Sequence, residues 1–222
     1  MREGTPLLKG TALIANPVFL ARHGETESNR AGVYAGRRTD PLTRNGRSQV
    51  ARLAEQIKAL GIRQIWSSSV WRALESASLL REHLRLPITI DQRLDEMRLG
   101  PWDGRSEAEV ARDFPDDYKL WLTHPDEVRL EGRETLTQVA ARTMAAVADA
   151  CATHLPTLLV THVAPIRVAV LTTVGCPLGS YKRVTIPNAS CVRLDCAAEQ
   201  ATWAPHGASL RAEIEQAGPV AA

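Results

Sequence analysis

Short apolar runs alternate along this chain with longer segments in which apolar residues recur every three or four positions. The short runs are bounded by glycine, proline or polar residues, which is typical of buried strands. They predict strands at residues 17–21, 62–66, 88–90, 157–161 and 191–194. Strands that alternate with helices indicate a parallel or mostly parallel sheet that is covered by helices.

The longer segments carry helix signals at their ends. One helix is predicted to begin after the capping residue Thr43 and to close at Gly61. Others are predicted at 72–84 and 165–174, and from a capping box at residue 135 through about residue 151. The expected fold class is therefore α/β, a three-layer sandwich with a mostly parallel central sheet and helices on both faces.

The chain length sets the domain count. The 222 residues, 44% of them hydrophobic, are enough for one substantial core. No linker-like segment interrupts them, so we expect a single domain over residues 17–203. Residues 1–16 are expected to be a flexible lead-in, and a last short strand after residue 196 is expected to lead into a loose tail over 204–222.

Charge and cysteine usage exclude several function classes. The 27 basic and 25 acidic side chains give a net charge of +2 and form no basic tract, which argues against nucleic-acid binding. The N-terminal segment has too short an apolar stretch for a signal peptide or a membrane span. The four cysteines show neither metal-ligand nor disulfide-scaffold spacing, which fits reduced thiols in a cytoplasmic protein.

One polar motif stands at the end of the first predicted strand: Arg22-His23-Gly24-Glu25-Thr26. A guanidinium beside an imidazole disfavours protonation of the ring and can also grip phosphate oxygens. Gly24 would let the backbone approach an anion closely. On its own the motif is also compatible with a structural histidine, but His162 stands in a matching place, after the strand pattern at 157–161. Both histidines thus lie where open α/β sheets bind ligands.

Several further segments complete a family pattern. They are Asn29 after the first motif, residues 36–46 with Asp40-Pro41-Leu42-Thr43, Ser67-Ser68 followed by Arg72 and Ser76-Ala77, the segment 96–104 that begins with Glu96, Gly132-Arg133-Glu134-Thr135-Leu136, and Val160-Thr161-His162. In this order and spacing the chain resembles the histidine phosphatase superfamily, also called the phosphoglycerate mutase-like family, over residues 17–195. Taken alone, Arg72 could be solvated surface and Glu96 a loop carboxylate.

The resemblance implies a reaction and a role for each site residue. His23 would attack phosphorus to form a phosphohistidine, while Arg22, Arg72, His162 and the neutral donor Asn29 would hold the phosphoryl oxygens. Glu96 would protonate the leaving group and later take a proton from water. A phosphate-binding histidine gains by being charged, so His23 and His162 are expected to have opposed protonation states. The implied partner is a small-molecule phosphate ester, with no cofactor, nucleic acid or membrane; a homodimer is left open.

Two other kinds of chemistry are compatible with part of this residue set. Two histidines and a glutamate are plausible zinc ligands, but Arg22 would oppose a divalent ion, so no metal is expected. A non-catalytic protein that binds a phosphorylated ligand is weakened by the completeness of the residue set.

Within the family, the chain is more similar to the phosphatase branch, which includes alpha-ribazole phosphatases and broad acid phosphatases, than to the mutases. The sequence after Glu96 has the Gly-x-Trp-x-Gly pattern of that branch and lacks the longer insert of the mutases. Hydrolysis is therefore favoured over phosphoryl transfer. The insert at about 105–134 is expected to form a helical lid, with Phe114, Tyr118 and Trp121 choosing the substrate. Val163-Ala164-Pro165 replaces the glycine pair of many relatives and leaves phosphate binding there in question.

Overall fold

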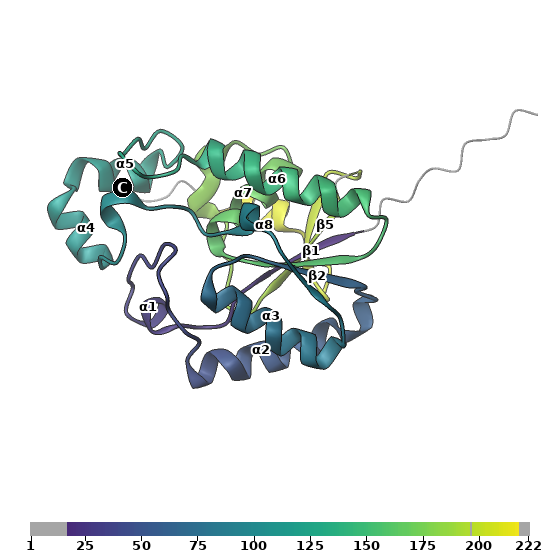
Figure 1. Cartoon of the computed structure of the whole chain (residues 1–222). Helices are drawn as coiled ribbons and strands as arrows, with labels where there is room; N and C mark the ends of the chain where they lie inside the picture. Colours follow the sequence, from purple (N-terminus) through teal and green to yellow (C-terminus); the bar gives the residue numbers. More distant parts are fainter. Residues whose placement is uncertain (1–16, 196, 218–222) are drawn as a thin grey trace, which may run out of the picture.

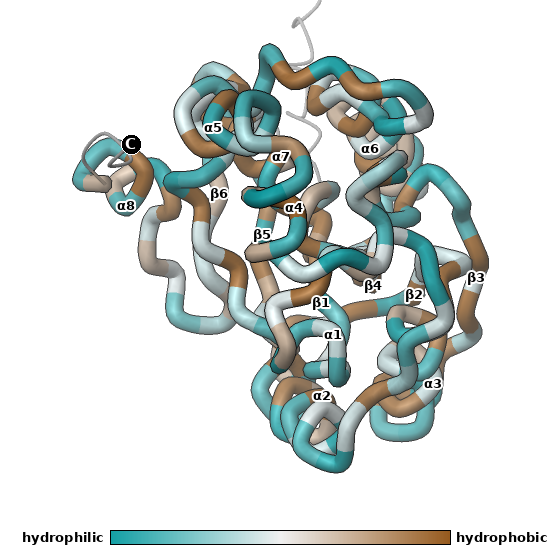
Figure 2. The backbone as a smooth tube through the Cα atoms, turned by 90° about the vertical axis from the view of Figure 1, so that its left-hand side faces the viewer, coloured by the Kyte–Doolittle hydropathy of each residue, from teal (hydrophilic) through white to brown (hydrophobic). Residues whose placement is uncertain are grey.

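Six strands form one sheet in the order β3-β2-β4-β1-β5-β6, which Figure 2 shows edge to edge across the molecule. The protein is represented by a computed structural model that describes residues 17–195 and 197–217. The strands are β1 (Val18–Arg22), β2 (Gln64–Ser67), β3 (Ile88–Ile90), β4 (Thr157–Thr161), β5 (Cys191–Asp195) and β6 (Gln200–Ala204). The expected lead-in at 1–16 lies outside the described residues.

The sheet is mostly parallel, as the alternating sequence pattern predicts. Strands β1, β4, β2 and β3 pair in parallel, while β5 pairs antiparallel with both β1 and β6. The carboxyl ends of β1, β2 and β4 therefore meet at one edge of the sheet.

Two pairs of helices cover the two faces of the sheet (Figure 1). On one face lie α2 (Arg44–Ile57) and α3 (Trp71–Leu84), and on the other lie α6 (Leu136–Ala152) and α7 (Val163–Thr173). Alternate residues of β1 enter different cores: Phe19 packs with the residues of α2 and α3, whereas Leu20 packs with those of α6 and α7. This confirms the α/β three-layer arrangement, and it follows from the period of two along a strand.

The helix ends follow the chemistry of their capping residues. The Thr43 side chain accepts a hydrogen bond from the Gly46 amide at 2.9 Å, which caps α2. A 3-10 turn, η1 (Lys58–Leu60), follows α2 and ends at Gly61, whose φ of 67° is left-handed. The capping box of Thr135 and Gln138 opens α6, as predicted.

The remaining elements lie around this sandwich. They are α1 (Glu27–Arg30), the turns η2 (Gln92–Leu94), η3 (Gly100–Trp102) and η4 (Leu178–Arg183), α4 (Glu107–Asp113), α5 (Pro115–Thr123) and α8 (Leu210–Gln216). The insert at 105–134 does contain helices, α4 and α5, which lie beyond one end of the sheet in Figure 1. None of the helices within residues 17–195 and 197–217 is long and apolar enough to cross a membrane.

The expectation of a loose tail from residue 204 onward is wrong for the described part of that segment. Residues Leu210–Gln216 form α8, which Ser209 caps through a hydrogen bond to the Ala212 amide. Leu210 and Ile214 are buried in the core shared with α6 and α7. Their spacing of four residues puts both side chains on one helix face, and this small apolar face attaches the segment to the domain.

Candidate active site

The register of three parallel strands brings the predicted histidines together. Arg22 at the end of β1 is paired with Thr161 at the end of β4, so the next residues, His23 and His162, are neighbours. Their ring centroids are 5.1 Å apart. Ser68 follows the end of β2 on the other side of β4, where its amide donates to the Val160 carbonyl at 2.9 Å. Two histidines and one serine therefore share the carboxyl edge of the sheet.

The His23 ring is held in one tautomer. Its Nδ1 lies 2.7 Å from the Gly24 carbonyl oxygen, which can only accept, so Nδ1 carries the proton. Its Nε2 therefore has a lone pair, which accepts a hydrogen bond from Arg72 Nε at 3.0 Å. Burial and then the charges of Arg72 and Arg22 hold the pKa of His23 well below its ordinary value of 6.5. The ring is neutral and presents Nε2 as a nucleophilic nitrogen.

Two arginines line the same cavity as His23, and both donate hydrogen bonds to backbone carbonyls. Arg72 is 2% exposed, and its Nη2 donates to the Gly36 carbonyl at 2.7 Å. Arg22 Nη1 donates to the Ile186 carbonyl at 2.6 Å, while its buried Nε has no partner among the described residues. Burial lowers the pKa of Arg22 to about 10, and it also lowers the pKa of Arg72. Both side chains remain cationic at neutral pH and form a rigid positive end of the site.

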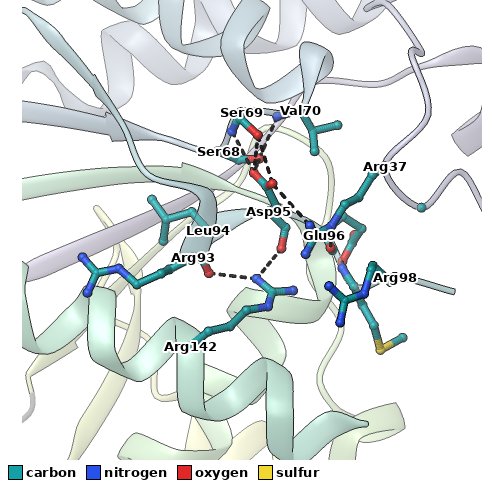
Figure 3. A network of polar contacts seen from close by, with 12 residues as sticks. Arg37, Ser68, Ser69, Val70, Arg93, Leu94, Asp95, Glu96, Arg98 and Arg142 are labelled. Carbon is teal, nitrogen blue, oxygen red and sulfur yellow. Dashed lines mark hydrogen bonds and ion pairs between the residues drawn. The ribbon is translucent and has the colours of Figure 1, made fainter. Parts of the chain in front are cut away.

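Glu96 reaches the same place from a loop that is fixed by a polar network (Figure 3). Arg142 Nη1 donates to the carbonyls of Arg93 and Asp95 at 2.8 and 2.6 Å, and Arg37 Nε donates to the Glu96 carbonyl at 2.8 Å. The Glu96 side chain is 8% exposed and accepts from the Met97 amide at 2.8 Å. The loop therefore holds the Glu96 carboxyl group near Arg22 and Arg72. This group raises the pKa values of both arginines and so offsets part of the lowering by burial.

Asp95, which neighbours Glu96 in the sequence, has a different role. Its carboxylate accepts from the hydroxyls of Ser68 at 2.8 Å and Ser69 at 2.9 Å, and from the Ser69 amide at 2.8 Å (Figure 3). These bonds occupy the carboxylate and turn it toward the start of α3. Asp95 is thus a structural acceptor that also orients Ser68.

His162 is the most enclosed member of the site. Its Nε2 lies 2.8 Å from Ser68 Oγ, and since the Ser68 hydroxyl already donates to Asp95, Nε2 must be the donor. Its Nδ1 is buried and has no partner among the described residues. Burial, Arg72 and His23 hold the pKa of His162 well below 6.5. The protein's own groups thus favour the neutral form of both rings, in contrast to the opposed protonation states expected from the sequence.

Asn29 is also oriented by its neighbours. Its Oδ1 accepts from the Thr26 amide at 3.2 Å and from Asn188 Nδ2 at 2.9 Å. This leaves the amide nitrogen of Asn29 as the group that can donate to a ligand. Asn188, which also donates to the His23 carbonyl at 3.3 Å, lies 165 residues beyond His23, and nothing in its local sequence indicates a role.

A cavity of about 150 Å³ collects these groups. Of the site residues predicted from the sequence, Arg22, His23, Asn29, Arg72 and Glu96 line it. His162 is fully buried and does not line it, although its ring is in contact distance of His23. The structure therefore brings the predicted residues together, and their catalytic roles remain predictions.

The rest of the cavity wall differs partly from the expectation. Trp121 of the insert lines the cavity, but Tyr118 donates its hydroxyl to Glu107 at 2.7 Å, and Phe114 packs under Arg105. Further lining residues were not predicted, among them Tyr34, Arg167, Tyr181 and Lys182. Only Arg167 carries a usable signal, because it lies one helical turn after Val163 at the start of α7.

Two sequence-level expectations concern the backbone around the histidines. A Cβ on Gly24 would lie 2.5 Å from the Gly46 carbonyl oxygen, so this glycine permits close packing against α2. Helix α7 begins at Val163, directly after His162. Val163 and Ala164 both line the cavity, which places the positive end of the helix dipole there in spite of the missing glycine pair.

The arrangement has the parts that displacement at phosphorus needs. A neutral nucleophilic nitrogen accepts a hydrogen bond from one fixed cation, Arg72, and a second cation, Arg22, lines the same cavity as the Glu96 carboxyl group. Within residues 17–195 and 197–217, no group of three or more His, Cys, Asp or Glu side chains could hold a metal ion. The two arginines would in any case repel a divalent cation at this place.

Comparison with known proteins gives a consistent picture. Residues 18–208 match the family model of the histidine phosphatase superfamily (branch 1). The chain is 30% identical over 192 residues to "Probable phosphoglycerate mutase GpmB" of Proteus mirabilis (strain HI4320). The matched residues cover 86% of this chain and 88% of the relative. It is also similar to the structure of a mycobacterial glucosyl-3-phosphoglycerate phosphatase in complex with VO3, with a TM-score of 0.77 and 27% identity over 88% of this chain and 100% of that one.

The alpha-ribazole phosphatase from Shigella flexneri shares the fold, with a TM-score of 0.73 and 24% identity over 84% of this chain and 94% of that one. The match to the family model covers most of the chain, and it includes every residue that the sequence assigned to the site. This protein belongs to the histidine phosphatase superfamily, branch 1.

Proposed function

We propose that this protein is a phosphatase that hydrolyses a small-molecule phosphate monoester through a phosphohistidine at His23. The observation that carries the proposal is the state of the His23 ring. Its proton is on Nδ1, bound to the Gly24 carbonyl, and its Nε2 lone pair faces the Arg72 guanidinium. Such a nitrogen is nucleophilic without losing a proton first, and the cation beside it attracts the phosphoryl group that it attacks.

The first step forms a bond between His23 Nε2 and phosphorus and breaks the bond from phosphorus to the ester oxygen. Arg22, Arg72 and the Asn29 amide stabilise the three equatorial oxygens, whose charge is spread in the transition state. Glu96 gives its proton to the departing alkoxide, so an alcohol leaves.

The second step reverses these roles. Glu96, now a carboxylate, takes a proton from a water molecule that attacks phosphorus, and the bond to His23 Nε2 breaks. The products are inorganic phosphate and the protonated Glu96 of the starting state. The fixed loop around Glu96 supports this double role, because one carboxyl group must serve the leaving oxygen and the entering water in turn.

A mutase is the second candidate function, because the relative from Proteus mirabilis carries the name of a phosphoglycerate mutase. The chemistry of the first step is the same, but an alcohol would accept the phosphoryl group in place of water. The shorter segment after Glu96 and the similarity to a phosphatase of known structure favour hydrolysis.

The experiment that separates these candidates follows both fates of the phosphoryl group. Purified protein is incubated with a panel of alkyl, sugar and carboxylate-bearing phosphate esters, and released phosphate and newly formed phosphate esters are measured together. The proposal expects release of phosphate in stoichiometric amount. Formation of a new ester in excess over phosphate would establish the mutase, and neither product with any ester would leave a non-catalytic phospholigand-binding protein.

The proposal extends to the setting of the enzyme. We infer a cytoplasmic protein that binds neither nucleic acid nor a membrane and that can form a homodimer. The even spread of basic residues and the cysteine spacing support the first part of this inference. Measurement of the mass in solution by light scattering tests the dimer.

A further inference from the structure

The cavity contains more positive charge than one phosphoryl group requires. Beyond Arg22 and Arg72, its wall includes Arg167 from α7 and Lys182 from η4. Two aromatic rings hold these cations in place. The Arg167 guanidinium carbon lies 4.8 Å from the centre of the Tyr181 ring, and Lys182 Nζ lies 4.4 Å from the centre of the Trp121 ring. Both rings belong to residues that also line the cavity.

A third cation supports this group from behind. Arg133 is 8% exposed, and its guanidinium carbon lies 4.3 Å from the Trp121 ring centre and 4.7 Å from the Trp102 ring centre. Its Nε and Nη2 are buried without a partner among the described residues. The Trp121 ring therefore contacts two cationic side chains, Arg133 and Lys182, and fixes the position of both.

These cations have no matching carboxylate. In the described part of the chain, no acidic oxygen lies within 4.0 Å of a charged nitrogen of Arg133, Arg167 or Lys182. Burial, together with Arg167 and Arg133, lowers the pKa of Lys182 to about 8, and Glu107 offsets this only in part. Proteins seldom bury like charges without compensation, and where they do so in a cavity the charges commonly serve a ligand.

The positive charges of the cavity can be matched with the negative charges of a ligand. Arg22 and Arg72 match the two negative charges of a phosphoryl dianion, and the first step of the proposed mechanism uses Glu96 as a neutral acid. The charges of Arg167 and Lys182, which line the same cavity, then remain without a counter-charge. A ligand that neutralises them must carry a second anionic group.

We propose that Arg167 and Lys182 form a second anion subsite, so that the substrate is a phosphate monoester with a further carboxylate or phosphate group. The subsite rests on the proposed function only in placing the reacting phosphoryl group at Arg22, His23 and Arg72. Trp121 and Tyr181 define the walls between which the second anion enters. A neutral polar end in the same place would leave both cations unpaired and would bind more weakly.

The test uses phosphonates, which the enzyme cannot hydrolyse, so that binding is measured apart from turnover. Three series with two to four carbons between their ends carry a carboxylate, a second phosphonate or a neutral hydroxyl at the far end. Dissociation constants are measured by calorimetry for the parent protein, Lys182→Gln, Arg167→Gln and the control Arg183→Gln. Arg183 is the neighbour of Lys182 on η4 and does not line the cavity. Thermal unfolding of each variant checks that it folds.

In the parent protein, at least one linker length of a doubly anionic series should bind about 10-fold more tightly than the hydroxyl series, as one charge-assisted hydrogen bond suffices to produce. Lys182→Gln and Arg167→Gln should each reduce that ratio, and Arg183→Gln should preserve it. The tighter of the two anionic series identifies the chemistry of the second group.

Equal affinity of all three series for the parent protein would overturn the subsite, as would a ratio that survives in both Lys182→Gln and Arg167→Gln. Failure to bind any phosphonate at millimolar concentration would also count against it. If the ratio behaves as expected but no phosphate ester is hydrolysed, the proposed function fails while the subsite stands.

Discussion

Replacement of Ser68 by alanine should disturb the second histidine without touching the nucleophile. Ser68 Oγ donates to Asp95 Oδ1 at 2.8 Å, and it accepts from His162 Nε2 at 2.8 Å and from the Val70 amide at 3.1 Å. Because the hydroxyl proton is committed to Asp95, the His162 proton is held on Nε2. The sequence predicts that His162 binds a phosphoryl oxygen. With the proton on Nε2, Nδ1 can donate to that oxygen only when the ring is cationic, so the predicted role would couple phosphoryl binding to protonation of His162.

The size of the effect can be bounded from these contacts. Ser68→Ala leaves the His162 Nε2–H and the Val70 amide without their acceptor, and His162 is 0% exposed. An unsatisfied buried group costs about 1–3 kcal/mol, so the free energy of unfolding should fall by at least that amount. The energetic cost of losing the fixed tautomer should lie between the cost of losing a neutral hydrogen bond and that of losing a transition-state donor. This corresponds to roughly a 10- to 100-fold fall in kcat.

The chain offers a matched control in Ser69→Ala. Ser69 Oγ also donates to Asp95, at 2.9 Å to each carboxylate oxygen, but it has no contact with His162 among the described hydrogen bonds. Steady-state hydrolysis of an alkyl phosphate gives kcat for both variants, and nitrogen NMR of histidine-labelled protein gives the tautomer of His162. Ser68→Ala should lose both rate and tautomer, whereas Ser69→Ala should keep both. A normal tautomer and normal kcat in Ser68→Ala would refute the reasoning.

Two further predictions concern the acid and the buried rings. Glu96→Gln should slow hydrolysis of an alkyl phosphate by roughly 100- to 10,000-fold, but should affect the burst phase of p-nitrophenyl phosphate much less, since that leaving group departs unprotonated; equal slowing of both would remove Glu96 as the acid. Burial lowers the pKa of His23 and His162 in the folded protein, so the unfolded chain binds more protons below about pH 6.5. The free energy of unfolding by denaturant should therefore fall on acidification below that pH, by up to roughly 2.7 kcal/mol per pH unit for two protons. His162→Gln should flatten this dependence and the exposed-site control His124→Gln should not; an unchanged slope in His162→Gln would contradict the assignment.

The sequence predicted most of the framework because its signals are local and repeated. The predicted strands, including the last short one after residue 196, and the helices at 44–57, 71–84 and 136–152 follow apolar periodicity and side-chain caps. The histidines could be placed at one sheet edge because each directly follows a buried strand, and parallel strands end at the same edge. Glu96 has no such local signal, and only the family pattern selected it over Asp95.

The parts that could not be predicted depend on contacts between distant segments. Lys182 lies on a 3-10 turn that has no periodic pattern, and its place in the cavity depends on how η4 packs against α7. The tautomer of His162 requires Asp95, Ser68 and His162 to meet from three different connections of the sheet. The helix at 210–216 has only two buried apolar residues, too few to outweigh the surrounding alanine, proline and glycine in a sequence pattern.

The central claim is that His23 Nε2 becomes phosphorylated during turnover, and direct detection of that adduct tests it. The protein is mixed briefly with a phosphate ester and quenched in alkali, where phosphohistidine is stable, and intact-mass and peptide mass spectrometry then locate the added phosphoryl group. We expect one acid-labile phosphoryl group on His23 in the parent protein and none in His23→Ala. A phosphoryl group on another residue, or full hydrolytic activity in His23→Ala, would contradict it.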